Sequence, residues 1–162
     1  QNPKFNLLLV AQFNLIPELN RLIDHEIELA KHGKGGRIIL KMNALQDPTM
    51  IERLYEASQA GVEIDLIVRG ICCLIPGQEY SRNIRITRIV DTFLEHARIW
   101  YFGNGGKPKL FLGSPDWMRR NLYRRIEAVT AQLLEVAPPA KRENTFAIHL
   151  LRVPEKQIVT RL

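Results

Sequence analysis

One histidine, His96, stands at the start of a strand-like run in the stretch FLEHARIWYFGNGG. An imidazole can gain or lose a proton near neutral pH, so His96 could act as a general acid or base, or accept a phosphoryl group as a nucleophile. A catalytic histidine usually needs a second group that orients its ring. The carboxylate of Glu127, in a later strand-like run, is the candidate for that role.

Two arginines could hold an anionic substrate beside this pair. Arg69 directly follows the apolar run VEIDLIV, and ligands of open α/β sheets bind at the carboxyl ends of strands. Arg125 precedes Glu127 by two residues, which places both side chains on one face if the segment is a strand. A guanidinium is planar, permanently charged and able to bind two phosphate oxygens at once. Spacing alone leaves a purely structural role for these residues equally open.

The elements that must position these residues begin with an alternation of strands and helices. Residues 5–11, 37–42 and 62–68 are short apolar runs, which are typical of buried strands. Leucines and isoleucines spaced by three and four predict a helix over residues 17–32. A second helix is expected from the Asp-Pro pair at residue 47 to about residue 60. This order predicts a parallel sheet with helices packed on it.

The second part of the chain has shorter elements. The glycines and asparagine of GNGG, at residues 103–106, are typical of a hairpin turn. The expected elements are strands at residues 84–89, 98–102, 110–112 and 125–130, a helical turn that reaches Glu95, and a short helix at 115–122. The predicted fold class is therefore α/β, with a mixed sheet flanked by helices in a single domain.

The charge of the protein is concentrated in one stretch. The 162-residue chain has a net charge of +6, and the segment from Arg82 to Arg125 holds ten basic residues and three acidic ones. One interpretation is a solvated basic surface. The other is a partner that carries many negative charges, such as a phosphate chain, a nucleotide or a nucleic acid.

The cysteines and the apolar runs indicate the cellular compartment in which the protein is expected. Cys72 and Cys73 are adjacent, so they form neither a disulfide framework nor a zinc site, and we expect both to be reduced. No apolar run approaches the ~20 residues that a membrane span needs, and no secretory signal opens the chain. We therefore expect a cytoplasmic protein with no integral membrane segment, either free or peripheral to the membrane.

Several long phrases resemble one family. The C-terminal catalytic region of bacterial polyphosphate kinases is similar to the phrases ILKMNALQDPTMIERLYEASQAGVEIDL, LIVRGICCLIPG, FLEHARIWYFGNGG and LGSPDWMRRNLYRRIE, which match it in order. The resemblance covers about residues 5–129. It implies a phospholipase-D-like fold for residues 1–130, as the second of two facing catalytic halves. Residues 131–162 depart from the family's usual ending and are expected to form a divergent C-terminal tail.

The resemblance also implies an activity and a role for each candidate residue. Polyphosphate kinases reversibly transfer the terminal phosphate of ATP to inorganic polyphosphate, through a phosphohistidine and with Mg²⁺. In this sequence, His96 and Glu127 match essential catalytic residues. Arg69 matches an arginine that binds the nucleotide's phosphates, and Arg125 matches the arginine before the acid. His96 and Arg125 are therefore also expected to contact ATP or its phosphates.

The phosphorylated histidine of the family belongs to the preceding half, and no segment here matches its motif. We therefore expect this chain alone to be inactive, with Mg²⁺ held mainly by that half and the nucleotide rather than by residues of this chain. The expected partners are ATP, ADP, polyphosphate and the enzyme's other domains, in a homo-oligomer when complete.

Two other functions remain open at this point. His96, Arg98 and the later Gly113-Ser114 resemble a degenerate form of the phospholipase D signature His-x-Lys…Gly-Ser, so a phosphodiesterase or nuclease half is one alternative. The usual lysine is replaced by Arg98, which argues against an ordinary phosphodiesterase. The other alternative is a non-catalytic module that binds polyanions through its basic face.

Overall fold

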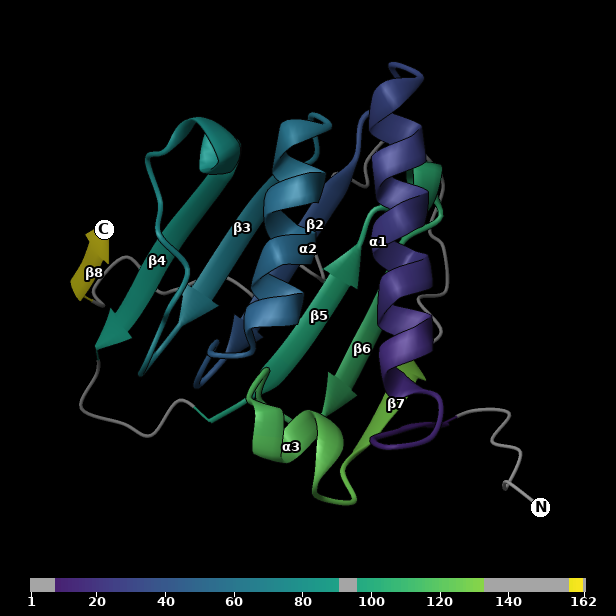
Figure 1. Ribbon diagram of the computed structural model, residues 1–162, viewed down its shortest axis with the longest axis vertical. Coiled ribbons are helices and arrows are strands. Elements are labelled where there is room, and N and C mark those ends of the chain that lie inside the picture. Colours follow the sequence, from purple (N-terminus) through teal and green to yellow (C-terminus); the bar gives the residue numbers. More distant parts are fainter. Residues whose placement is uncertain (1–7, 91–95, 133–157, 162) are drawn as a thin grey trace.

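The computed structural model describes residues 8–90, 96–132 and 158–161, and the helical turn expected before Glu95 lies outside them. These residues form an eight-stranded mixed sheet in the order β1-β7-β6-β5-β2-β3-β4-β8 (Figure 1). The strands are β1 (Leu8–Val10), β2 (Arg37–Met42), β3 (Glu63–Val68), β4 (Ile84–Val90), β5 (Arg98–Phe102), β6 (Lys109–Gly113), β7 (Ala128–Gln132) and β8 (Ile158–Arg161). The α-helices are α1 (Leu15–Lys31), α2 (Pro48–Gln59) and α3 (Arg119–Tyr123), with short 3₁₀ turns at Glu79–Ser81 and Asn104–Gly106.

The helices predicted from the apolar spacing are confirmed, and their ends have local causes. Asp47 caps α2 by accepting a hydrogen bond from the Met50 amide at 3.0 Å, and Pro48 occupies the first turn. Gly33 follows α1 with φ of 69°, a conformation that glycine adopts without strain. Among the helices in the described part of the chain, none combines the length and the apolar character that a membrane span requires.

The sheet is mixed, as predicted, but its order differs from a simple parallel arrangement. β2, β3 and β4 are parallel neighbours, whereas β5 lies antiparallel beside β2 and pairs with β6 as a hairpin. β7 and β1 continue beyond β6, also antiparallel. The first three strands therefore do not form one continuous parallel sheet, because the hairpin and β7 lie between β1 and β2.

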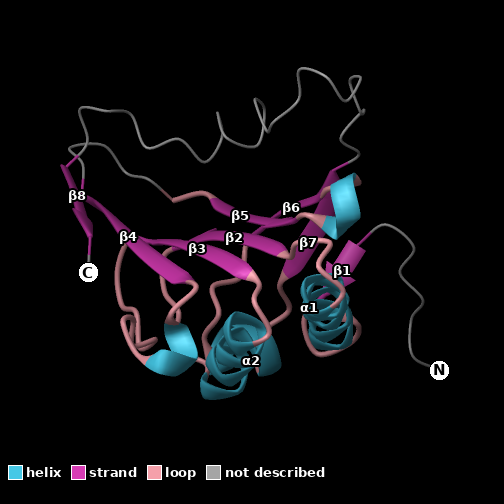
Figure 2. Ribbon diagram, turned by 90° about the horizontal axis from the view of Figure 1, so that it is seen from above, coloured by secondary structure: helices cyan, strands magenta, loops and turns pink. Residues whose placement is uncertain are grey.

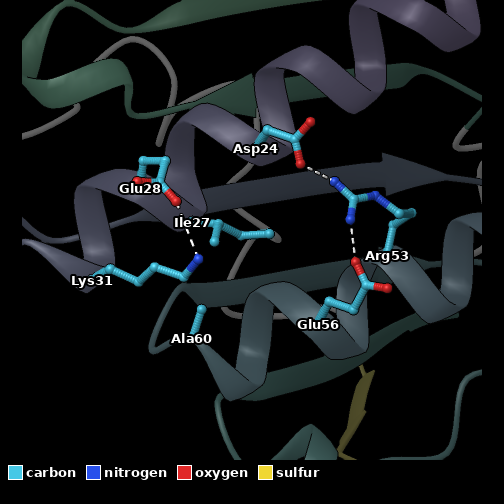
Figure 3. A pocket seen from close by; sticks show the side chains of 7 residues that line it. All are labelled: Asp24, Ile27, Glu28, Lys31, Arg53, Glu56 and Ala60. Carbon is cyan, nitrogen blue, oxygen red and sulfur yellow. Dashed lines mark hydrogen bonds and ion pairs between the residues drawn. The ribbon is translucent and has the colours of Figure 1, made fainter.

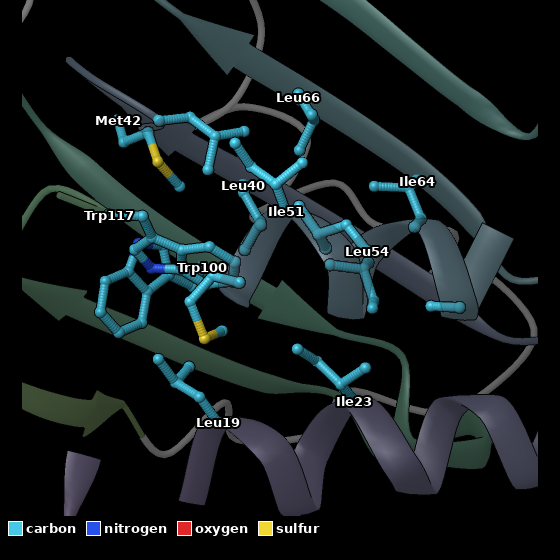
Figure 4. Close-up of a cluster of buried hydrophobic side chains, with 14 of the residues drawn as sticks. Leu19, Ile23, Leu40, Met42, Ile51, Leu54, Ile64, Leu66, Trp100 and Trp117 are labelled. Atoms are coloured by element: carbon cyan, nitrogen blue, oxygen red, sulfur yellow. The ribbon is translucent and has the colours of Figure 1, made fainter. Parts of the chain in front are cut away.

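The main core lies between the sheet and the two long helices, which cover the same face (Figure 2). Figure 4 shows Leu19 and Ile23 of α1 and Leu54 of α2 facing Leu40 and Trp100 of the sheet. All five of these side chains are at most 1% exposed. Burial of such a side chain stabilises the fold by about 1.5–3 kcal/mol. This core holds the ends of β2, β3 and β5 in fixed relative positions.

Trp117 connects the segment after β6 to this core. Its indole is fully buried and meets Trp100 edge to face, with ring centroids 5.8 Å apart. Its amide donates to the Ala44 carbonyl at 3.1 Å, and its carbonyl accepts from the amides of Gln46 and Asp47 at 2.8 and 2.9 Å. The segments that follow β2 and β6 are therefore fastened together, although more than 60 residues separate them in the sequence.

The other face of the sheet carries a smaller apolar cluster and a charged one. The apolar side chains are Ile39, Ile67, Ile89, Ile99, Tyr101 and Leu110. Beside them, Asp65 accepts hydrogen bonds from Arg37 and Arg85. Burial acts to raise the pKa of Asp65, but the two guanidinium groups outweigh it and hold the pKa below its usual value. Charges on this face are thus paired within the chain.

Candidate active site

Two candidate site positions follow directly from the parallel strands β2 and β3. Asn43 and Arg69 are the first residues beyond these strands, and the Arg69 amide donates to the Met42 carbonyl at 3.2 Å. The Gly70 amide donates to the Asn43 carbonyl at 2.8 Å. A Cβ atom at Gly70 would lie only 2.9 Å from that same carbonyl, so glycine is required for this close approach. Arg69 therefore stands at the carboxyl end of β3, as the sequence predicted.

Strand register brings His96 to the same edge. β5 is antiparallel to β2, with Lys41 opposite Ile99, so the chain just before β5 lies beside the end of β2. Continuation of this register by two residues places Ala97 opposite Asn43. His96 therefore lies at this edge, between the end of β2 near Asn43 and the end of β6 near Ser114. His96 is exposed.

Ser114 and Glu127 complete the row. β6 ends at Gly113, which lies opposite both Arg98 and Val129, so Ser114 falls at the same edge. A Cβ atom at Gly113 would lie only 2.8 Å from the Ala128 carbonyl oxygen. Glycine is therefore needed here for β6 and β7 to approach this closely. Glu127 stands directly before β7.

We call this row the carboxyl edge, and in strand order it contains Glu127, Ser114, His96, Asn43 and Arg69. Neighbouring strands lie about 4.8 Å apart, so the main chain at His96 is about 10 Å from that at either end of the row. The carboxyl edge therefore brings together His96, Glu127 and Arg69, three of the four residues that the sequence singled out, with the histidine in the middle.

Glu127 is held by three elements. Its carboxylate accepts a short hydrogen bond from the Ser114 hydroxyl and one from the Asn121 amide group of α3 at 2.8 Å. Its main-chain carbonyl accepts from the Ala11 amide at 2.9 Å. Each oxygen of the carboxylate thus has a partner other than His96 in the described part of the chain. Glu127 is thus fixed at the edge by these partners, two strands away from His96 in the strand order.

The strand assigned to residues 125–130 is wrong at its beginning. β7 begins only at Ala128, so Arg125 and Glu127 lie in the turn after α3 and do not share a strand face. The alternation of residue types was misleading because α3 ends at Tyr123 and the chain must turn before it enters the sheet. Ile126, which would be a strand residue in that interpretation, is 82% exposed. Arg125 is itself exposed.

The cations of the candidate site differ in their surroundings. Within the described residues, the guanidinium groups of Arg69 and Arg125 have no carboxylate partner, and the Arg69 carbonyl accepts a hydrogen bond from Arg88 at 3.3 Å. Arg98 is different because it forms an ion pair with Asp116 at 3.1 Å, with side chains only 14% and 11% exposed. Among the described residues, the site thus combines two arginines available to an anion, Arg69 at the edge and Arg125 in the turn after α3, with Arg98, whose charge is already matched.

Three residues of the edge were not predicted from the sequence. Asp116 accepts from the amides of Asn43 and Ala44, and Asn121 supports Glu127. The carboxamide of Asn43 is buried, and neither its oxygen nor its nitrogen has a hydrogen-bond partner among the described residues. A polar residue directly after a buried strand was the signal for Asn43. No local pattern marks Asp116 and Asn121, because their partners are distant in sequence.

The described residues contain no cluster of three or more His, Cys, Asp or Glu side chains that could hold a metal ion. The two acids at the edge already use their carboxylates, Glu127 on Ser114 and Asn121, and Asp116 on Arg98 and two amides. The described residues of the edge therefore do not fit Mg²⁺ as a site made from this chain alone.

The hollow in Figure 3 lies elsewhere, between α1 and α2. We call it the helix groove, and it is lined by Asp24, Ile27, Glu28, Lys31, Arg53, Glu56 and Ala60. Its charged groups are paired with one another: Arg53 with Asp24 and Glu56, and Lys31 with Glu28 at 3.1 Å. No predicted site residue lines it. The charged side chains of the helix groove are therefore already paired and have little attraction left for a bound ion.

The fold of the chain can be compared with solved structures first, and its family follows from sequence matches. A likeness of fold alone is found with NucT from Helicobacter pylori, at a TM-score of 0.55 and 11% identity over 78% of this chain and 84% of that one. The class is the α/β fold with a mixed sheet that the sequence predicted.

The family follows from closer matches. Residues 8–149 match the model of the polyphosphate kinase C-terminal domain 2. The chain is 52% identical over 126 residues to polyphosphate kinase 1 of Chlorobaculum tepidum, and 54% identical over 127 residues to the polyphosphate kinase of Thermosynechococcus vestitus. These matches cover 77% and 78% of this chain. The chain belongs to the polyphosphate kinase family.

A solved structure agrees with this assignment. The polyphosphate kinase of Porphyromonas gingivalis is similar over the whole of this chain, with a TM-score of 0.87 and 50% identity, and the match covers 24% of that protein. The chain spans only 18% and 17% of the lengths of the two curated relatives. The activity of the whole enzyme is therefore a matter for proposal.

Proposed function

We propose that this chain acts as the C-terminal catalytic part of a polyphosphate kinase, which reversibly transfers the terminal phosphate of ATP to inorganic polyphosphate. The observation that carries the proposal is the carboxyl edge, where the strand order places His96 between Glu127 and Arg69. Membership of the family supports the assignment of substrate. On this proposal the phosphorylated histidine comes from a preceding catalytic half of the same enzyme.

Arg69 and Arg125 act first, as phosphate ligands. Both guanidinium groups lack a carboxylate partner among the described residues, so their charge is available to the nucleotide or to polyphosphate. Binding flanking phosphate oxygens would align the terminal phosphorus with the histidine of the other half. Aligned reactants need less entropy loss at the moment of reaction, which lowers the barrier.

His96 acts on the leaving oxygen. During transfer the bond between the terminal phosphorus and the bridging oxygen of ATP breaks, and a phosphorus–nitrogen bond forms at the histidine of the other half. Negative charge develops on the bridging oxygen of the departing ADP. His96 donates a hydrogen bond or a proton there, and takes the proton back in the reverse direction.

Glu127 supports this step from a fixed position. Its hydrogen bonds with Ser114 and Asn121 hold the carboxylate at the same edge as His96, so its negative charge is in place before the reaction and need not reorganise. Mg²⁺, when bound with the nucleotide, would neutralise phosphate charge. We propose further that the complete enzyme is a homo-oligomer of the cytoplasm.

The test is a chimeric kinase. The segment of Chlorobaculum tepidum polyphosphate kinase 1 that matches this chain is replaced by the chain's own residues, and polyphosphate synthesis from ATP is measured. We expect synthesis by the chimeric kinase and none by the 162-residue chain alone. A folded chimera without synthesis, together with hydrolysis of bis-p-nitrophenyl phosphate by the chain alone, would support a phosphodiesterase and end the proposal.

A second measurement tests the division of roles between the two halves. The chain alone is incubated with ATP labelled at the terminal phosphate and with Mg²⁺, and we expect the protein to remain unlabelled. Acid-labile label on His96 would show that this histidine is itself the phosphorylated residue. Saturable binding of polyphosphate with neither activity would leave only the non-catalytic module.

A further inference from the structure

We propose that Arg98 and Asp116 are a positioning pair for His96, and that the guanidinium of Arg98 is not a phosphate ligand. The inference rests on the proposed function for its kinetic consequence, but its geometry stands on the chain alone. It concerns an arginine next to the carboxyl edge whose charge is matched by the buried carboxylate of Asp116. From the sequence alone, Arg98 could equally be a phosphate ligand, and Asp116 had no assigned role.

The guanidinium of Arg98 uses all three of its nitrogens within the chain. Nε and Nη2 donate to the two oxygens of Asp116 at 3.3 and 3.1 Å. Nη1 donates to the main-chain carbonyl of His96 at 3.1 Å. The side chains of Arg98 and Asp116 are only 14% and 11% exposed. An arginine bound in this way fixes the backbone of His96 two residues before it.

Asp116 extends the pair to a third strand. Besides Arg98, its Oδ1 accepts from the amides of Asn43 and Ala44 at 2.8 and 3.3 Å. One carboxylate therefore binds the end of β2, the start of β5 and, through its own main chain, the segment after β6. Trp117 anchors that segment in the core next to it. The main chain at His96 is thus held by a rigid part of the fold.

The geometry requires both the fork and the charge of arginine. Lysine has a single nitrogen, so it could bind Asp116 or the His96 carbonyl well, but not three acceptors in one plane. The pairing also directs the fork at Asp116 and at the His96 carbonyl, and the Arg98 side chain is only 14% exposed, so its N–H donors do not face a ligand. Arg69 has no such partner among the described residues.

The first experiment follows arginine side chains by NMR in the 162-residue chain, with tripolyphosphate as the probe. We expect the Nε–H signals of Arg69 and Arg125 to shift in a saturable way. The Nε–H signal of Arg98 should exchange slowly with water and keep its position. A saturable shift of Arg98 with the same dissociation constant as Arg69 would overturn the proposal. This outcome does not depend on whether the chain belongs to an active kinase.

The effect of one substitution on tripolyphosphate affinity distinguishes a positioning role of Arg98 from a phosphate-binding role. Asp116→Asn keeps an oxygen for the Asn43 amide but releases the charge of Arg98. If Arg98 were a phosphate ligand held back by Asp116, this variant would bind tripolyphosphate several-fold more tightly. We expect the dissociation constant to stay within twofold of the wild type, while the shift that tripolyphosphate induces in the His96 ring is lost. Glu18→Gln, which releases the exposed Arg21 in the same way, is the matched control.

Kinetics in the chimeric kinase complete the test. Arg98→Gln and Asp116→Asn should each lower kcat for polyphosphate synthesis by at least tenfold and leave KM for ATP unchanged, because they displace His96 without removing a substrate contact. Arg98→Lys should recover only part of the loss. Variants that raise KM instead would identify Arg98 as a ligand. Variants that only lower Tm, with normal kcat per folded molecule, would leave no positioning role.

Discussion

The helix groove and the carboxyl edge hold similar residue types in opposite states. In the helix groove, a hollow of about 300 Å³, Arg53 is matched by Asp24 and Glu56, and its Nε donates to Asn20 at 3.3 Å. At the carboxyl edge, Arg69 and His96 have no carboxylate partner among the described residues, whereas Arg98 is matched by Asp116. The more obvious hollow thus carries the charges that are already satisfied.

The difference teaches that charge state, rather than depth, distinguishes the proposed site from the rest of the described surface. A charge paired inside the chain contributes to stability and has little left for a ligand. A charge that the fold brings to an open edge without a partner retains its attraction for a substrate. Substitutions in the two regions should therefore separate cleanly, with kinetic effects at the edge and small stability effects in the groove.

The largest expected effect is that of His96→Ala in the chimeric kinase. Loss of the general acid should lower kcat by about 10²–10⁴-fold, because no other group stands beside the leaving oxygen in the proposed step. The exposed His96 side chain makes no core contact, so the melting temperature should not change. Arg53→Gln in the helix groove is the control and should keep normal kcat. Full activity in His96→Ala would erase the contrast between the two regions.

Glu127→Gln should have the next largest effect. A glutamine side chain keeps the shape but loses the negative charge, and it offers one oxygen to the two donors Ser114 and Asn121. We expect kcat to fall by about 10²-fold, at the lower end of the range for an acid–base group, with a smaller change in KM for ATP. Steady-state kinetics and a melting curve are measured on the same preparation. A lower melting temperature with normal turnover would make Glu127 a purely structural residue.

Binding of polyphosphate by the chain should depend on Arg69. Arg69→Gln removes a charge-assisted hydrogen bond, so we expect the dissociation constant for polyphosphate to rise about tenfold. Binding by the wild type should weaken as salt rises, because exposed charges are screened. Titrations at low and high salt measure both effects, with Arg53→Gln as the control of equal charge. Salt-independent affinity would contradict the electrostatic interpretation of the edge.

The smallest effect concerns a paired charge outside both regions. Because the pKa of Asp65 is lowered in the folded state, its contribution to stability is present above the unfolded pKa and is lost as the pH falls through the folded one. Asp65→Asn should lower the free energy of unfolding by about 1 kcal/mol at pH 7, since Arg85 is largely exposed. The difference should be constant above about pH 4 and shrink as the pH falls further. Denaturant titrations across this range check it, and a difference that does not shrink at low pH would refute the pairing.

Local patterns predicted most of the elements around the site because their causes are local. The spacing of apolar residues located α1, the Asp-Pro pair at residue 47 located α2, and the apolar runs located β2 and β3, all to within two residues. The turn between α3 and β7 could not be read in this way. Its residues alternate as a strand would, but the ties of Glu127 to Ala11, Ser114 and Asn121 shape it. Those partners are distant along the chain or lie on other elements.

From residue types and order alone, the chain already specified an α/β fold, a histidine with acid–base capacity, and arginines suited to phosphate. These properties depend on side-chain chemistry and short-range periodicity. The tertiary structure decided which arginines are available, since only packing brings Asp116 to Arg98 and leaves Arg69 without a carboxylate among the described residues.

Packing likewise buried Glu26 of α1, where desolvation raises the pKa of its carboxyl although the amides of Arg37 and Asn104 donate to it. A helical pattern assigns such an acid to the solvent face. Whether a charge is free or matched depends on the dielectric surroundings and on partners that may stand 70 residues away, and periodicity carries no information about either.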